Sequence, residues 1–194
     1  MSSMAKVDVY VGIIPKKLQI TPLFPPEREL ELDGACDKVK KEKVFSWQLL
    51  EYALNKSFSL SLKDLALKRS ANGKWECDKC YFSITHSKGV VAVAVADEPI
   101  GIDVERLNRD TLAIEKTLTE SENKGLSTQN GDKDRFLIKK WTEKESLYKK
   151  RGEGAFNPFK IETTGEFFVT KWLEFGGEVF ALTVACDENS MVNI

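Results

Sequence analysis

Two carboxylates on one predicted strand could together hold a cation. Ile100, Ile102 and Val104 alternate along one face of this strand, so Asp103 and Glu105 fall together on the opposite face. Their backbones are then about 7 Å apart, from a rise of about 3.3 Å per residue. Magnesium binds one or two carboxylates and completes its coordination with water and substrate phosphate oxygens. The pair therefore favours a site for a phosphate ester, and the alternative is an edge strand with a polar solvent face.

A second group of charged residues lies on one face of a helix predicted at residues 132–150. This face begins apolar, at Leu137, and places Lys144, Glu145 and Lys149 where further core residues are expected. Burying a charge is costly unless the charge is paired or serves a ligand. The pattern therefore favours a site for phosphates and proton transfer. The alternative is an exposed pair of Glu145 and Lys149 at i, i+4 spacing.

Four motifs together resemble the 4'-phosphopantetheinyl transferase superfamily. Gly-Ile-Asp-Val-Glu at residues 101–105 is followed by Trp-x-x-Lys-Glu-Ser-x-x-Lys at 141–149. Phe-Ser-Ile-Thr-His-Ser at 82–87 is similar to the family's strand motif, and Asn-Gly-Lys at 72–74 is similar to its Gly-Lys element. The resemblance covers roughly residues 73–154, and the length is similar to that of the two-halved, monomeric surfactin-synthetase type.

The resemblance implies a metal site and a base. Asp103 and Glu105 are expected to hold Mg²⁺, or Mn²⁺ in its place. Glu122 is expected to be the third carboxylate, with Glu120 as a near alternative. Glu145 is the expected base for a serine hydroxyl of the acceptor.

Lysines supply the phosphate contacts that the resemblance implies. Lys144 and Lys149 are expected to contact the phosphates of the reacting diphosphate, whose departing group needs its growing charge neutralised. An early basic run stands where the family provides further cations for coenzyme A. Lys41 is our choice from this run, and Lys38 and Lys43 remain alternatives.

Coenzyme A is the co-substrate that the family uses. Lys74, Thr85 and His86 are expected to bind it, with His86 at its 3'-phosphate. Two positions depart from the family pattern. Trp75 stands where proline usually follows Gly-Lys, and Gln48 lies where an arginine commonly helps to hold the nucleotide.

The implied reaction moves the 4'-phosphopantetheine arm of coenzyme A to a serine of an apo acyl or peptidyl carrier protein and releases 3',5'-adenosine bisphosphate. Two alternatives stay open. One is another magnesium-dependent enzyme that cleaves phosphodiesters, although this interpretation leaves Lys74, Thr85 and His86 unexplained. The other is a degenerate, non-catalytic homologue that still binds carriers. The carrier and its pathway, whether fatty acid, polyketide or nonribosomal peptide synthesis, are left undetermined by the sequence.

Composition limits the possible partners and location. The chain has 29 basic and 30 acidic residues, so it lacks the global field that attracts nucleic acid or anionic membranes. A secretory leader and a membrane-spanning stretch are not expected, which favours a cytoplasmic location. The resemblance to the surfactin-synthetase type implies a monomer. Cys77 and Cys80 have the spacing of a metal or redox pair. Because a second pair is missing and a strand follows where a redox motif needs a helix, we interpret both cysteines as incidental.

Elements of the same kind recur in the two halves of the chain. The first half is predicted to contain a strand at 7–11, helices at 38–56 and 62–69, a turn at Asn72-Gly73, and a hairpin of strands at 82–85 and 90–96. The second is predicted to contain a strand at 100–105, helices at 112–116 and 132–150, and a hairpin of strands at 167–175 and 178–185.

This recurrence predicts an α+β fold of two similar halves, residues 1–97 and 98–194, with a boundary near Asp97. By resemblance the arrangement is pseudo-dimeric, with the active site in the cleft between the halves. The first half is then expected to contribute residues that bind coenzyme A, and the second to contribute the metal ligands and the base.

Overall fold

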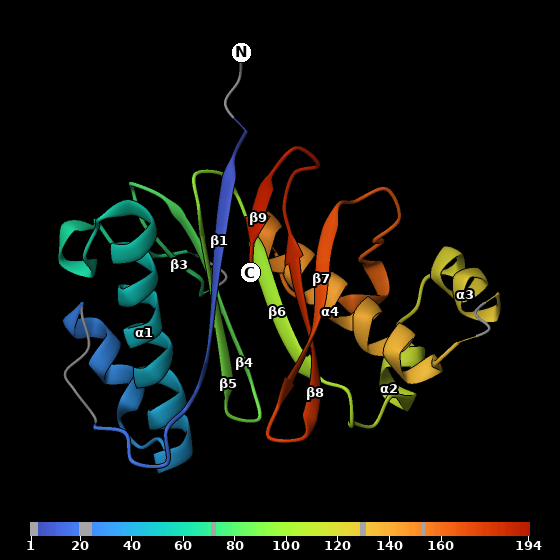
Figure 1. The fold of residues 1–194 in the computed structure, drawn as a ribbon, viewed down its shortest axis with the longest axis horizontal. Helices are drawn as coiled ribbons and strands as arrows, with labels where there is room; N and C mark the ends of the chain where they lie inside the picture. The colour runs from blue at the N-terminus through green and yellow to red at the C-terminus, as the bar shows by residue number, and fades with distance from the viewer. Residues whose placement is uncertain (1–3, 20–24, 71–72, 129–130, 153) are drawn as a thin grey trace.

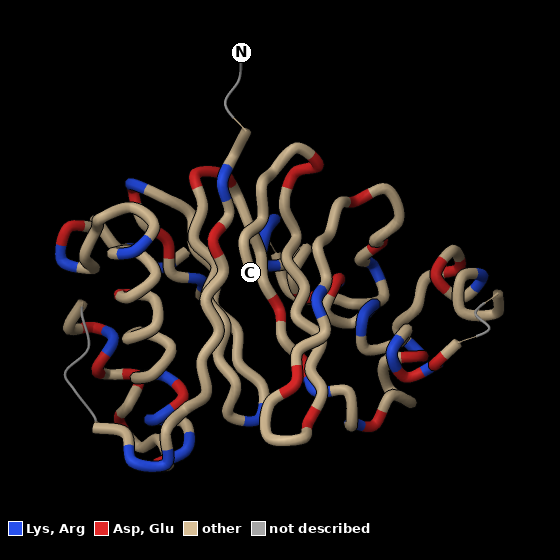
Figure 2. The backbone as a smooth tube through the Cα atoms, in the orientation of Figure 1, with Lys and Arg blue, Asp and Glu red and all other residues tan. Residues whose placement is uncertain are grey.

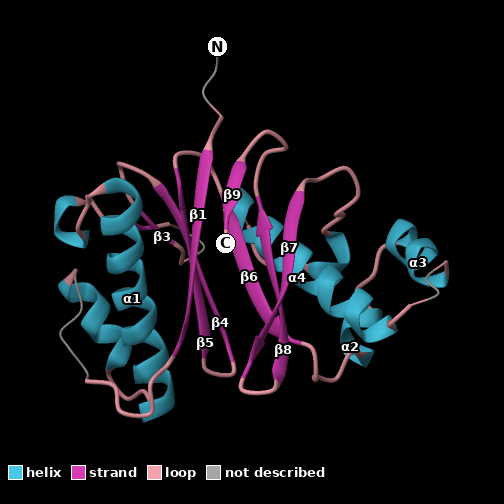
Figure 3. Cartoon of the chain, in the orientation of Figure 1, coloured by secondary structure: helices cyan, strands magenta, loops and turns pink. Residues whose placement is uncertain are grey.

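The computed structural model describes residues 4–19, 25–70, 73–128, 131–152 and 154–194. It confirms a mixed fold of helices and strands. Two sheets pack against each other in the middle of the molecule, with one long helix on each outer side (Figure 1). Figure 3 shows the same layers by element type. The long helices are α1 (Asp37–Phe58) and α4 (Lys133–Arg151).

The first sheet has the strand order β4-β5-β1-β9 and is antiparallel except between β1 and β9. Its strand β9 comes from residues 98–194 and pairs with β1 from residues 1–97. The second sheet has the order β6-β8-β7 and is antiparallel. The strands are β1 (Lys6–Ile13), β4 (Tyr81–Ser87), β5 (Val90–Ala96), β6 (Gly101–Arg106), β7 (Phe168–Phe175), β8 (Glu178–Ala185) and β9 (Met191–Asn193).

The core between the sheets is built from the alternating apolar residues of both. Val7 and Ala94 of the first sheet, and Ile102, Val104 and Leu182 of the second, belong to one buried cluster. Each strand turns every second side chain to this cluster, since successive side chains point to opposite faces. The face of β6 that carries Ile102 and Val104 is thereby buried, and the other face is left for Asp103.

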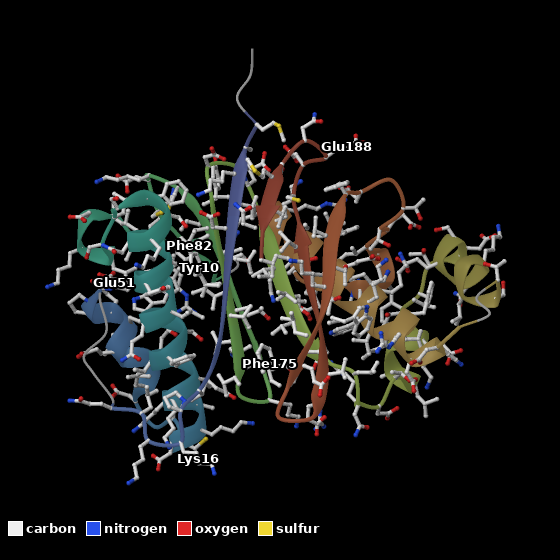
Figure 4. All side chains as sticks on the ribbon, viewed as in Figure 1. Tyr10, Lys16, Glu51, Phe82, Phe175 and Glu188 are labelled. Carbon is white, nitrogen blue, oxygen red and sulfur yellow. The ribbon has the colours of Figure 1, made fainter. Side chains whose placement is uncertain are left out.

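Each long helix covers the outer face of one sheet. Trp47 and Leu50 of α1 pack against Phe82 and Val93, and Tyr10 lies at the border of this cluster. Figure 4 shows Phe82 and Tyr10 on the side of the strands that faces α1. On the other side of the molecule, Leu137 and Ile138 of α4 are buried together with Ala181 of β8. The helical apolar spacing predicted for both helices is thus confirmed.

Strands β4 and β6 lie side by side and are joined through side chains. The backbone N–H of Ile102 donates to Ser83 Oγ at 3.1 Å, and that of Val104 donates to Thr85 Oγ1 at 3.3 Å. Hydroxyls on β4 therefore accept hydrogen bonds from backbone N–H groups at the edge of β6, which would otherwise be buried and unpaired. This contact brings the first half of the chain against the strand that carries Asp103.

The prediction of a helix at residues 62–69 is wrong. Leu62–Asp64 forms one 3-10 turn (η2), closed by a capping box between Ser61 and Asp64. After this turn the chain extends, and β2 (Lys68–Arg69) pairs with β3 (Trp75–Glu76). Leu62 and Leu65 are buried against α1. The apolar spacing of this segment, which resembles that of a helix, therefore reflects tertiary packing.

Several short elements complete the fold. Gly73 of the predicted turn has φ +83°, whereas Asn72 lies outside the described residues. The helix predicted at 112–116 is confirmed, whereas the helix that follows it and strand β9 were not predicted. The remaining elements are η1 (Pro26–Leu32), α2 (Leu112–Glu115), α3 (Glu120–Ser127) and η3 (Pro158–Lys160).

Lys and Arg are interspersed with Asp and Glu over the backbone (Figure 2), and the chain has 29 basic and 30 acidic residues. Within the part of the chain that the structure describes, no helix is both long and apolar enough to cross a bilayer.

Candidate functional site

The acidic face of β6 points away from the core, as its alternation predicts. Asp103 is 6% exposed and accepts a hydrogen bond from Thr85 Oγ1 at 2.9 Å. Glu105 lies two residues further on the same face and accepts from Ser87 Oγ at 2.7 Å. Both carboxylates are therefore held by hydroxyls of β4, which fix their orientation.

Helix α4 approaches β6 closely because residue 101 is glycine. A Cβ added to Gly101 would lie 1.8 Å from the backbone oxygen of Ser146 and 2.5 Å from the backbone nitrogen of Lys150. At this separation Lys149 reaches β6. Its Nζ lies 2.7 Å from Asp103 Oδ1 and 4.0 Å from Glu145 Oε2. The helix thereby gathers two carboxylates and an ammonium group at one place.

The site has an electrostatic character of its own. Burial raises the pKa of Asp103 above its usual value, although Lys149 and Thr85 act in the opposite direction. Burial also raises the pKa of Glu145, and the negative charges of Asp103 and Glu105 raise it further. These carboxylates are partly buried and repel one another. A bound cation or a proton would relieve this repulsion.

The donor set fits magnesium. Asp103 and Glu105 are hard oxygen donors, and the raised pKa of Asp103 reflects burial and, to a smaller extent, the charge of Glu105. At present each carboxylate is paired within the protein, since Arg109 Nη1 lies 2.5 Å from Glu105 Oε2 and Lys149 is bound to Asp103. Over the described ranges, no three His, Cys, Asp or Glu side chains are grouped as ligands for one metal ion.

Glu122 does not lie with Asp103 and Glu105. Lys144 Nζ is 2.8 Å from Glu122 Oε2, and the exposed fractions of the two side chains are 0% and 1%. Thr163 Oγ1 and the backbone N–H of Thr119 donate to the same carboxylate. These neighbours stabilise Glu122 in the fold, and its role as a third metal ligand stays a prediction.

Lys144, the partner of Glu122, is held by backbone groups as well. Besides the ion pair, its Nζ donates to the backbone oxygens of Pro158 at 3.0 Å and Ile161 at 2.5 Å. A fully buried ammonium with three acceptors has no surface to offer a phosphate. The alternative carboxylate, Glu120, has a side chain that is 87% exposed and pairs with Lys124.

A pocket of about 360 Å³ opens beside this acidic site. Lys149 belongs to its wall as well as to the contacts of Asp103, so the pocket and the acidic face meet at this residue. The cationic or ionisable side chains of the wall come from five elements or segments: Arg28, Lys43, Lys74, His86 and Lys149. Aromatic and small residues complete it: Trp47, Trp75, Tyr148, Phe82, Ile84, Ser46, Ser83 and Gly73.

The residues predicted to bind coenzyme A are only partly gathered in this pocket. Lys74 and His86 line it, and Lys74 Nζ donates to the backbone oxygen of Lys149 at 2.8 Å. Thr85 lies next to the pocket on β4 but turns its hydroxyl to Asp103. Lys41 donates to the backbone oxygen of Lys16 at 3.1 Å, whereas Lys43 reaches the pocket wall.

Sequence reasoning missed the contribution of η1 to this pocket. Arg28 stacks over the Trp47 ring, with its guanidinium carbon 4.5 Å from the ring centroid. Trp47 in turn makes an edge contact with Trp75. The signal available was the Pro-Glu-Arg sequence at 26–28, since proline is favoured in the first turn of a helix.

The family model and the curated relatives that match this chain carry the same name. A family model described as the 4'-phosphopantetheinyl transferase superfamily matches residues 99–184, the part that carries Asp103, Glu105 and Glu145. The 4'-phosphopantetheinyl transferase psf-1 of Bacillus pumilus is 27% identical over 111 residues, which cover 55% of this chain and 48% of that protein.

Two further relatives carry the same name. A 4'-phosphopantetheinyl transferase of Bacillus subtilis is 31% identical over 114 residues, 56% of this chain and 51% of that protein. The 4'-phosphopantetheinyl transferase gsp of Aneurinibacillus migulanus is 36% identical over 81 residues, 40% of this chain and 34% of that protein. The chain thus spans about half the length, or less, of the curated relatives it matches. Residues 99–184 of this chain are thus similar to the 4'-phosphopantetheinyl transferase superfamily.

Proposed function

We propose that this protein transfers the 4'-phosphopantetheine arm of coenzyme A to a serine hydroxyl of an apo acyl or peptidyl carrier protein. The observation that carries the proposal is the position of Lys149, which lines the basic pocket and lies 2.7 Å from Asp103. A pocket with lysines and aromatic rings suits the nucleotide diphosphate of coenzyme A. The acidic face beside it suits the metal that such a diphosphate carries.

In this proposal Asp103 and Glu105 hold Mg²⁺, or Mn²⁺ in its place. When bound, the ion neutralises the diphosphate and the charge that develops on the leaving group. Magnesium needs no more than one or two protein carboxylates, so Glu122 is not required as a ligand. Lys149 contacts the diphosphate from the pocket side, and Lys74 supports it from its own part of the wall.

Glu145 is the proposed proton acceptor. The serine oxygen of the carrier forms a bond to the β-phosphorus, and its proton passes to Glu145. The bond from this phosphorus to the bridging oxygen breaks, and 3',5'-adenosine bisphosphate leaves with the electron pair. The raised pKa of Glu145, caused by burial and by Asp103, suits this role because a base works best when its pKa approaches the working pH.

The fold supports a cleft between two similar halves. Lys43, Lys74 and His86 come from residues 1–97, whereas Asp103, Glu145 and Lys149 come from residues 98–194. The joined edges of β4 and β6 are consistent with a pseudo-dimeric arrangement in a single chain. We propose that the monomer is the active form, and that the carrier docks where the Glu145 side chain, 24% exposed, reaches the surface.

A mass measurement tests the function. The protein is incubated with an apo acyl carrier protein, coenzyme A and Mg²⁺, and the intact mass of the carrier is followed over time. The expected result is a gain of one phosphopantetheine arm that EDTA abolishes and Mg²⁺ restores. Release of adenosine bisphosphate without a change in carrier mass would favour the phosphodiesterase alternative. Absence of both would favour a non-catalytic homologue.

A further inference from the structure

Two cysteines lie at the ends of the turn that joins β3 to β4. The sulfur atoms of Cys77 and Cys80 are 3.6 Å apart, and the Cys77 thiol also donates to the backbone oxygen of Cys80 at 3.1 Å. Both thiols are free in this structure. The sulfur–sulfur distance in a disulfide is about 2.05 Å, so a small movement of the two side chains would join them. The pair is therefore arranged for an intramolecular disulfide.

The surrounding fold holds this turn in place. Cys80 is 7% exposed and belongs to the apolar cluster between α1 and the first sheet, and Cys77 packs against the same cluster. Between them, the side chain of Asp78 accepts a hydrogen bond from the backbone N–H of Ala66 at 2.9 Å. Because the turn is fixed at these three points, closing a disulfide loses little further conformational entropy.

A second hollow, of about 440 Å³, opens onto both cysteines. Its lining comes from both halves of the chain. It includes Lys68, Tyr81 and Arg151, which are exposed, so the hollow reaches the surface. Cys77 is partly buried, whereas Cys80 is buried. A small molecule that enters the hollow would therefore meet Cys77 first.

The two thiols differ in acidity. The hydrogen bond with Cys80 lowers the pKa of Cys77 to about 6, whereas the hydrogen bond with Cys77 and burial raise the pKa of Cys80. The thiolate is the nucleophile in thiol–disulfide exchange, and a thiol attacks best when its pKa is near the working pH. Cys77 is thus the attacking group. It is activated by its partner and not by a helix N-terminus, since strand β4 follows Cys80.

We propose that Cys77 and Cys80 are a reversible dithiol–disulfide site that reacts with small-molecule disulfides. This inference is independent of the proposed function, and it replaces the interpretation of both cysteines as incidental. In the first step, the Cys77 thiolate forms a bond to one sulfur of the small disulfide, and the other sulfur leaves as a thiolate. In the second step, the Cys80 sulfur attacks the Cys77 sulfur, and the second small thiolate leaves.

The two steps balance. Two protein thiols and one small disulfide give one protein disulfide and two small thiols, so the protein loses two electrons and two protons and the small disulfide gains them. The first step also prepares the second. It removes the charge and the hydrogen bond of Cys77 that raise the pKa of Cys80, which allows Cys80 to lose its proton to the departing thiolate.

Peptide mapping tests the site directly. The reduced protein is incubated with oxidised glutathione at neutral pH, free thiols are blocked with N-ethylmaleimide, and the protein is digested with trypsin without reduction. Trypsin cuts after Lys74, Lys79 and Lys88. The two cysteines therefore leave in separate peptides, 75–79 and 80–88, unless a disulfide joins them. We expect the joined peptides, and we expect excess reduced glutathione to separate them. Joined peptides that form only with the strong oxidant diamide would overturn the inference.

Three variants assign the roles of the two thiols. Cys80→Ala should keep one glutathione on Cys77, because the second step is lost. Cys77→Ala should take up glutathione at Cys80 at least about tenfold more slowly than Cys80→Ala does at Cys77, because the remaining thiol is buried. Cys36→Ser removes an exposed thiol outside the site and should leave the joined peptides unchanged. Equal rates of uptake at Cys77 and Cys80 would overturn the assignment of Cys77 as the nucleophile.

Discussion

Lys149 Nζ lies 2.7 Å from Asp103 Oδ1, and the same carboxylate oxygen accepts from Thr85 Oγ1 at 2.9 Å. One carboxylate thus connects the helix, the strand and the neighbouring strand that surround the site. Because Lys149 also lines the pocket, an anionic ligand there could attract its ammonium group away from Asp103. The Asp103 carboxylate would then be available to another cation. If the proposed function holds, the ion pair of Asp103 and Lys149 would couple the binding of the diphosphate to the binding of the metal.

Replacing Asp103 with asparagine should stop transfer without unfolding the protein. The amide side chain of Asp103→Asn keeps the shape and an acceptor oxygen for Thr85, but it loses the charge that a divalent cation requires. We expect the rate of carrier modification, measured by intact mass, to fall at least about a hundredfold. The exposed Glu120→Gln should behave as the unmodified protein. Normal turnover by Asp103→Asn would remove this residue from the metal site.

Glu145→Gln should separate binding from catalysis. The side chain keeps its size but cannot accept the proton of the serine hydroxyl, so single-turnover transfer should slow by about a hundredfold or more. The dissociation constant of coenzyme A, measured by calorimetry, should change little. Glu188→Gln, on an exposed turn, serves as the matched control. An unchanged transfer rate would eliminate Glu145 as the base.

Lys144→Met should lower the free energy of unfolding of the protein. The change leaves the Glu122 carboxylate buried without its ammonium partner, and breaking one side of a buried ion pair costs about 3–5 kcal/mol. Urea denaturation at pH 7 measures the free energy of unfolding. Lys124→Met removes an exposed partner of Glu120 and should cost less than about 1 kcal/mol. Equal effects of the two changes would contradict the structural role of Lys144.

Acid should weaken the protein through Glu162. Burial alone would raise the pKa of this carboxyl, but hydrogen bonds from Thr164, Thr119 and Ser121 lower it from 4.5 to about 2. A lowered pKa in the folded state gives stability that is present above about pH 4.5 and is lost as the pH falls toward 2. Glu162→Gln should therefore lower Tm at pH 7, and its difference from the unmodified protein should shrink toward pH 2. A difference in Tm that stays constant from pH 7 to pH 2 would show that protonation of Glu162 is not linked to unfolding.

Cys77 should be the most reactive thiol near neutral pH. A hydrogen bond with Cys80 is the main reason that the pKa of Cys77 falls to about 6, and the two sulfur atoms are 3.6 Å apart. Alkylation by iodoacetamide, followed by peptide mass spectrometry, should show a half-maximal rate near pH 6. Cys80→Ala should move this midpoint upward because the side-chain hydrogen bond from residue 80 is lost. A midpoint near pH 9 in the unmodified protein would contradict the expectation.

Period-two alternation in the sequence predicted the strands that form the centre of the molecule. Ile100, Ile102 and Val104 are buried, so the orientation of Asp103 and Glu105 followed from geometry alone. The inward charge on α4 was also foreseeable, since Lys144 and Lys149 stand on an otherwise apolar stripe. Periodicity cannot distinguish a buried lysine that pairs with a carboxylate from one that awaits a ligand.

The position of Glu122 illustrates this limit. Thr119 and Glu122 form a capping box, a local signal that was visible in the sequence and that predicts the start of a helix. The resemblance to the family led instead to an expectation of metal binding. The partner of Glu122 is Lys144 on the next helix, and the two meet only through tertiary packing. Likewise, Glu31 accepts hydrogen bonds from Lys43 and Trp75, on segments that no local pattern connects.

The pairing of β9 with β1 has a consequence for the synthesis of the protein. Asp8 and Asn193 are joined by a hydrogen bond across 185 residues, so the outer edge of β1 finds this partner when nearly all of the described chain has left the ribosome. Contacts so distant in sequence slow folding, and an open strand edge invites aggregation in the meantime. Overexpression at low temperature, with chaperones in excess, should accordingly increase the yield of native material.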